Sequence, residues 1–115
     1  VLHDRPMHAA FVRQQLARSD RPDAVLCYGL FYATLVRAFA LELGLAIPRD
    51  LGVIVFGKRE ETILDLPFTV CLLDYTGMGE AAARMGLRKL EDPTARLAPV
   101  RLPLELLVRA STRNP

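Results

Sequence analysis

The sequence has 115 residues, 51% of them hydrophobic, which is enough for one folded core. Its 15 basic and 13 acidic residues give a formal net charge of only +2, too little for a nucleic-acid-binding surface. The most apolar stretch, residues 24–36, is interrupted by a glycine and is shorter than the ~20 apolar residues of a membrane span. Charged residues near the start precede a polar segment, so no signal peptide is expected. We therefore expect one domain, or part of one, in the cytoplasm.

Cys27 and Cys71 each lie within an apolar run, where a free thiol behaves as a small buried hydrophobic group. A core of this size needs no covalent crosslink, so we expect both thiols to be reduced. A single disulfide is the alternative.

The first half of the chain predicts a helix, a strand and a second helix. Residues 7–18 have helical periodicity, with Pro6 at a first-turn position. Residues 24–28 form a continuous apolar run of strand length, typical of a strand covered on both faces. Residues 30–43 are long enough for a helix that ends at Gly44.

This second helix has an unusual composition. Its only polar residues are Thr34, Arg37 and Glu42, whereas a surface helix of a monomer has a wide polar face. Such a helix must bury its outer side against something besides its own sheet. The composition therefore predicts a protein interface.

The second half begins with two more strands. Residues 51–56 form a buried strand, residues 58–67 a charged connector, and residues 68–73 the next strand. The alternation of helices and strands indicates an α/β fold with a doubly wound parallel sheet.

Asp74 can cap a helix over residues 75–90. Residues 100–108 then alternate as a strand, and Pro103 places the first half of that strand at an edge or a bend.

A dinucleotide-binding motif is imitated by residues 77–82, with the pattern G-x-G-x-x-A. Residues 74–76 separate it from the preceding strand, and Leu97 stands where an acidic residue is expected. We therefore interpret Gly79 as a close-packing position and expect no bound cofactor.

No catalytic or metal centre is predicted. His3 and His8 stand near one terminus without the three or four ligands of a metal site, and Glu60 and Glu61 fit a solvated connector. No nucleophile and base can be paired, so we expect no enzymatic activity; Arg109 fits a surface or salt-bridge role.

Four passages, in order, carry a family resemblance. They are RPDAVLCYG at 21–29, ALELGLAIPRDLGVIVFG at 40–57, LPFTVCLLDYTGMGEAAARMGLRKL at 66–90 and VRLPLELLVRAST at 100–112. Together they resemble the C-terminal half of the sensing domain of lactose-repressor-type (LacI/GalR) regulators.

The resemblance implies a partial lobe of the periplasmic-binding-protein type I fold, with residues 1–115 as the C-terminal part of one effector-binding and dimerisation domain. Members of that family bind a small effector between two lobes and bind operator DNA through an N-terminal region that this sequence does not contain. Effector binding alters their DNA affinity, an allosteric coupling. This chain would then supply one wall of the effector cleft.

Two departures from the family pattern fall on this wall. Gly29 and Leu30 stand where the family usually has Asn-Asp, and Gly57 stands where it commonly has an aspartate that contacts sugars or purines. A polar effector needs fixed hydrogen-bond partners, so we expect an altered effector, more apolar or anionic, or none. The effector-cleft candidates are Tyr28, Gly29, Leu30, Phe31, Gly57, Lys58 and Arg59.

The resemblance also implies a homodimer formed through residues 34–42 and 61–66, and the first of these segments is the apolar helix described above. The dimer-interface candidates are Thr34, Arg37, Ala38, Leu41, Glu42, Ile63, Leu64 and Leu66. The expected function is therefore that of an effector-sensing and dimerisation module of a transcription regulator. The alternative is a fragment of a periplasmic sugar-binding protein of the same fold.

Overall fold

The computed structural model describes residues 5–59, 62–63 and 66–112. The chain forms two compact units: unit 1 runs to Leu72 and resumes at Leu106, and unit 2 is Leu73–Glu105. Each unit is described by itself. That all 115 residues form part of a single domain stays a prediction.

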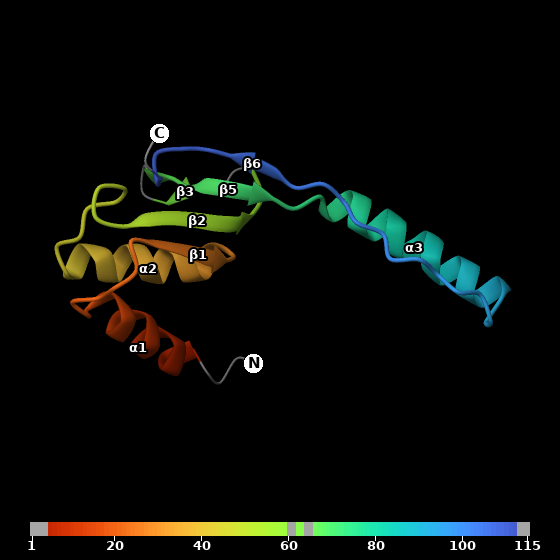
Figure 1. Ribbon diagram of the computed structural model, residues 1–115, viewed down its shortest axis with the longest axis horizontal. Coiled ribbons are helices and arrows are strands. Elements are labelled where there is room, and N and C mark those ends of the chain that lie inside the picture. The colour runs from red at the N-terminus through yellow and green to blue at the C-terminus, as the bar shows by residue number, and fades with distance from the viewer. Residues whose placement is uncertain (1–4, 60–61, 64–65, 113–115) are drawn as a thin grey trace. The chain divides into compact units, whose positions relative to one another are not determined.

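The elements follow the predicted order closely (Figure 1). Six of them lie within about two residues of their predicted bounds. They are α1 (Arg5–Leu16), β1 (Ala24–Tyr28), α2 (Leu30–Glu42), β2 (Gly52–Gly57), β5 (Thr69–Leu72) and α3 (Tyr75–Glu91).

Two regions differ from the prediction. The charged connector contains a short antiparallel pair, β3 (Thr62–Ile63) with β4 (Leu66–Pro67). The last strand, β6 (Glu105–Leu107), has only three residues, because the segment around Pro103 is not part of a strand. Proline lacks the N–H group that a strand ladder needs.

Unit 1 contains a sheet with the strand order β1-β2-β5-β6. β1, β2 and β5 run parallel, with Cys27 opposite Val55 and Val55 opposite Val70. The α/β fold with a mostly parallel sheet is therefore confirmed.

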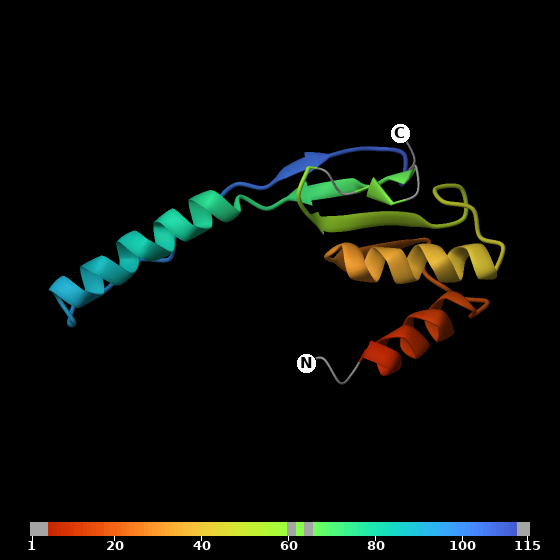
Figure 2. The same ribbon diagram turned by 180° about the vertical axis from the view of Figure 1, so that it is seen from behind.

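The core lies between this sheet and α2. Val53, Val55 and Val70 are fully buried, and α2 presents Ala33, Val36 and Ala40 to them. Figures 1 and 2 show α1 beside α2 within unit 1, and Leu16 of α1 joins the same core.

Only one face of β1 is covered in unit 1. Cys27 is buried, but the alternate side chains Leu26 and Tyr28 are exposed. The expectation that this strand is covered on both faces is therefore wrong within unit 1. The physical reason is that α2 packs against the face that bears Cys27, which leaves the opposite face of β1 in solvent.

Helix α2 ends as the sequence predicts. Gly44 has a φ of 70° in the left-handed region, and its N–H donates to the carbonyl of Leu41. The N–H of Leu45 donates to the carbonyl of Ala40, which completes a Schellman motif.

Hydrogen bonds of Ser111 and Thr69 fix the segment after β6 across two strands. The N–H of Thr69 donates to Ser111 Oγ at 2.7 Å, and the Ser111 hydroxyl donates to the carbonyl of Val53. Thr69 Oγ1 lies 2.7 Å from Thr112 Oγ1 and accepts from the N–H of Arg109 at 2.9 Å. We call Thr69, Ser111 and Thr112 the C-terminal latch. Its serine is fully buried, so these bonds stabilise the interior of unit 1.

Unit 2 consists of α3 and the segment that follows it. Asp74 caps the helix as predicted, because its Oδ1 accepts from the N–H of Gly77 at 2.8 Å. A side chain at position 77 would collide with Asp74. The close-packing interpretation of Gly79 is wrong, since a Cβ there would meet no heavy atom within 4 Å.

The G-x-G-x-x-A pattern lies inside α3 and not at a turn that opens a helix, which agrees with its rejection as a dinucleotide site. Among the helices in the described part of the chain, none has the length and apolar character needed to span a membrane.

Ser111→Ala removes a buried hydroxyl that both accepts and donates a hydrogen bond. The Thr69 N–H and the Val53 carbonyl would each lose a partner, so we expect the free energy of unfolding to fall by about 1–3 kcal/mol. Urea denaturation measures this change. Ser19→Ala at an exposed position is the control and should change stability by less than about 0.5 kcal/mol. Equal stability of the two variants would contradict the role of the latch.

Both cysteines are free, as predicted; Cys27 is buried and Cys71 half-buried. Burial raises the pKa of the Cys27 thiol to about 11 from its ordinary value of 9.0. In a Cys71→Ala background we expect iodoacetamide to label Cys27 at pH 8 about 100-fold more slowly than in the unfolded chain, because less thiolate is present. Equal rates in folded and unfolded protein would contradict this.

The same pKa shift links stability to pH. Above pH 9 the thiol of the unfolded chain ionises first, so the stability that Cys27 contributes should fall as the pH rises towards about 11. Cys27→Ala, measured by urea denaturation over the same pH range, should lack this component.

Candidate functional site

The carboxyl ends of the parallel strands bring the effector-cleft candidates together. Tyr28 ends β1 opposite Phe56 of β2, so residues 28–31 and 57–59 follow neighbouring strands at one edge of the sheet. In open α/β sheets, ligands bind outside the carboxyl ends of the strands. The predicted residues therefore lie at this edge of the sheet, which we call the ligand-facing edge for its place in the fold; that they contact an effector stays a prediction.

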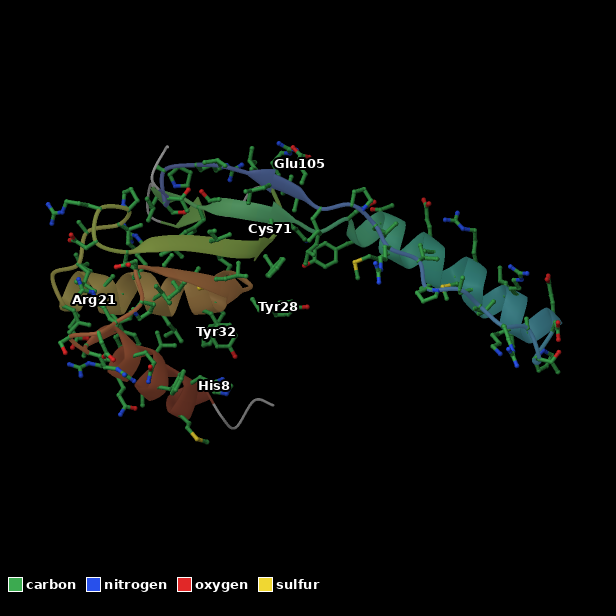
Figure 3. All side chains as sticks on the ribbon, viewed as in Figure 1. His8, Arg21, Tyr28, Tyr32, Cys71 and Glu105 are labelled. Carbon is green, nitrogen blue, oxygen red and sulfur yellow. The ribbon has the colours of Figure 1, made fainter. Side chains whose placement is uncertain are left out.

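Aromatic side chains dominate this edge. The rings of Tyr28 and Phe56 lie 6.3 Å apart, and those of Phe31 and Tyr32 lie 5.4 Å apart in an edge-to-face arrangement. The Tyr32 hydroxyl forms a 3.0 Å hydrogen bond with His8 Nδ1. Figure 3 shows Tyr28, Tyr32 and His8 at the same end of unit 1. We call Tyr28, Phe31, Tyr32 and Phe56 the aromatic cluster.

At this edge of the sheet, Gly29 and Gly57 offer only backbone atoms to a ligand. Gly29 has a φ of 91° and precedes α2 without a side-chain capping hydrogen bond, as its sequence predicts. Gly57 is buried at the end of β2. Lys58 and Arg59 follow at exposed positions, and the Arg59 carbonyl accepts a hydrogen bond from Arg109 Nη2.

Helix α2 presents the dimer-interface candidates on one side. Thr34, Ala38, Leu41 and Glu42 are exposed, whereas the core-facing side bears Ala33, Val36 and Ala40. Leu41 is 78% exposed. The Glu42 carboxylate is already paired, because it accepts from Arg13 Nε of α1 at 2.9 Å.

A hollow of about 250 Å³ joins this helix to the connector strands. It is lined by Arg37 and Leu41 of α2 and by Leu66 of β4, so two segments far apart in sequence meet at one surface. Ile63 pairs with Leu66 across β3 and β4. Leu64 lies outside the described residues. Leu66 of the second predicted interface segment thus lies beside α2, while the role of both segments in a dimer stays a prediction.

Metal ligation finds no support in the described residues. Among them, no group of three or more histidine, cysteine, aspartate or glutamate side chains could hold a metal ion. His8 is engaged with Tyr32. His3, Glu60 and Glu61 lie outside the described residues.

Another hollow, of about 540 Å³, lies at the amino ends of β1 and β2 and includes Arg21, Arg49 and Asp50 in its lining. Two hydrogen bonds from Arg49 and one from the N–H of Ala46 hold the pKa of Asp50 at about 2. This carboxylate is paired within the chain, and the hollow is at the opposite end of the strands from the aromatic cluster.

A protein-family model described as a periplasmic binding protein-like domain matches residues 2–112. The chain belongs to this family.

The named relatives of this periplasmic-binding-protein-like chain are regulators. It is 27% identical over 112 residues to the arabinose metabolism transcriptional repressor of Geobacillus stearothermophilus, covering 96% of this chain and 31% of the repressor. It thus spans about a third of that relative. The resemblance to LacI/GalR regulators is confirmed.

Solved structures agree on the fold. The structure of a LacI family transcriptional regulator from Bifidobacterium animalis subsp. lactis matches this chain with a TM-score of 0.74 and 27% sequence identity. The match covers 91% of this chain and 39% of the regulator's chain. An uncharacterised protein from Actinobacillus succinogenes has a TM-score of 0.76 at 23% identity, covering 92% and 40%, and supports the fold alone.

Sequence reasoning missed part of this site. Phe56, Tyr32 and His8 were not among the effector-cleft candidates, although each contacts a neighbour at this edge of the sheet. The sequence did contain a signal for Phe56, because it lies at the end of the apolar run that forms β2. The carboxyl ends of parallel strands meet at the same edge of a sheet, so Phe56 is expected near Tyr28 at the end of β1. No sequence signal links His8 to Tyr32, because their contact depends on how α1 packs against α2.

Proposed function

We propose that this chain is the effector-sensing and dimerisation module of a bacterial LacI-type transcription regulator. The match over residues 2–112 to a domain family whose named relatives here are regulators carries this proposal. In it, a small molecule binds at the carboxyl ends of the strands and alters operator affinity, while DNA is contacted only through a region outside this chain. The protein acts in the cytoplasm without a cofactor.

The ligand-facing edge supports a sensing role. A regulator of the same fold from Enterococcus faecium, 20% identical with a TM-score of 0.69, was solved with bound ribose. This chain offers Tyr28, Phe31, Lys58 and Arg59 around Gly29 and Gly57, so we propose an effector that differs from a simple sugar.

The side of α2 that α1 and the sheet leave exposed supports a homodimer. An exposed leucine beside a shallow hollow is unfavourable in water, and a second copy would remove it from solvent. The named relatives are regulators and not enzymes, which agrees with the proposed absence of catalysis.

The reading frame upstream of the Val1 codon tests the regulator against the alternative. A helix-turn-helix followed by a hinge segment supports the regulator. A signal peptide in that position would instead identify a periplasmic sugar-binding protein and overturn the proposal.

Leu41→Lys tests the interface. A lysine at this exposed position would place a charge in the apolar contact, so we expect the dimer to dissociate at concentrations at which the unchanged protein remains dimeric. Light scattering over a dilution series measures the mass of each species.

Met7→Lys is the matched control, because Met7 is 65% exposed on α1, outside the proposed interface. It should leave the dimer intact. An unchanged chain that is a 12.8 kDa monomer throughout the dilution series would contradict the homodimer.

A further inference from the structure

We infer that the effector presents a planar aromatic or heteroaromatic ring, which stacks on Tyr28 at the carboxyl ends of β1 and β2. This inference rests on the proposed sensing function and assigns a chemical class to its ligand.

Tyr28 provides the stacking surface. Its side chain is 77% exposed at the end of β1, and it is supported from one side by Phe56 on the neighbouring strand, with the two rings tilted by 52°. Figure 3 shows the Tyr28 ring projecting past the end of the strand. A ring supported on one side and exposed on the other is suited to a second aromatic partner at 4.5–7 Å.

The second aromatic pair borders the same place. Phe31, in the first turn of α2, is 44% exposed, and Tyr32 is held behind it by an edge-to-face contact at 75° and by the hydrogen bond to His8. Tyr32 is therefore fixed from α1 as well as from α2. Such fixed rings lose little conformational freedom when a ligand binds.

The backbone at Gly29, in the chain between Tyr28 and α2, is open on the side where a side chain would stand. It separates Tyr28 from α2, and a Cβ at this position would meet no heavy atom within 4 Å. Its φ of 91° also disfavours any residue with a side chain. The backbone can thus approach a flat ligand closely.

The same residues disfavour a polyol. Gly29, Leu30 and Gly57 have no polar side chains, although Gly29 and Leu30 follow β1 and Gly57 ends β2. A sugar buried against these three residues would find no hydrogen-bonding side chain on any of them, and each unsatisfied hydroxyl group is costly. A planar ring has few such groups and gains from stacking.

Isothermal titration of the intact protein tests the inference with named probes: indole, benzoate and adenine as planar rings, and D-ribose, D-glucose and L-arabinose as polyols. At least one planar ring should bind more tightly than all three sugars. Tyr28→Ala should weaken this binding by about three- to tenfold, whereas Tyr28→Phe should preserve it because the ring remains. Ser19→Ala, at an exposed position in the turn that precedes β1, at the opposite end of that strand from Tyr28, is the control and should leave the affinity unchanged.

Three outcomes would overturn the inference: a sugar that binds most tightly and is insensitive to Tyr28→Ala, ring binding that Tyr28→Ala leaves unchanged, or no binding by any of the six probes. The first of these leaves the sensing function standing. The upstream reading frame tests that function independently.

Discussion

The parallel pairing of β1, β2 and β5 is the constraint on which unit 1 depends. Its register sets Cys27, Val55 and Val70 in a row, so that one face of the sheet becomes a continuous apolar surface for α2. The same pairing brings the carboxyl ends of the strands together. Core and ligand-facing edge are thus two consequences of one hydrogen-bonded arrangement.

The C-terminal latch extends this arrangement to a distant part of the chain. Ser111 and Thr112 follow β6, after unit 2 has ended, and they bond to Thr69 and Val53 at the beginning of β5 and within β2. The Leu-Val-Arg-x-Ser-Thr ending at residues 107–112 therefore has a physical basis, because its two hydroxyl groups satisfy polar groups of neighbouring strands.

Helix α2 contributes to three surfaces. Its small residues Ala33 and Ala40 allow a close approach to the sheet, and its first turn holds Phe31 at the ligand-facing edge. Its outer side carries Leu41 beside Leu66. Ligand binding and dimerisation, as proposed, would both involve this one helix, so a ligand that shifts α2 would act on both sites.

The sequence by itself determined the element order, the Schellman end at Gly44, the Asp74 cap, the reduced cysteines and the family, because these depend on local hydrogen bonding and on hydrophobic patterns that neighbouring residues carry. The tertiary structure decided the rest. It showed that β1 is covered on one face in unit 1, that Gly79 is not closely packed, and that His8 bonds to Tyr32. These facts depend on which elements meet in space. The apolar run Ala24–Tyr28, for example, shows that a strand is apolar on both faces, but it does not show what covers each face.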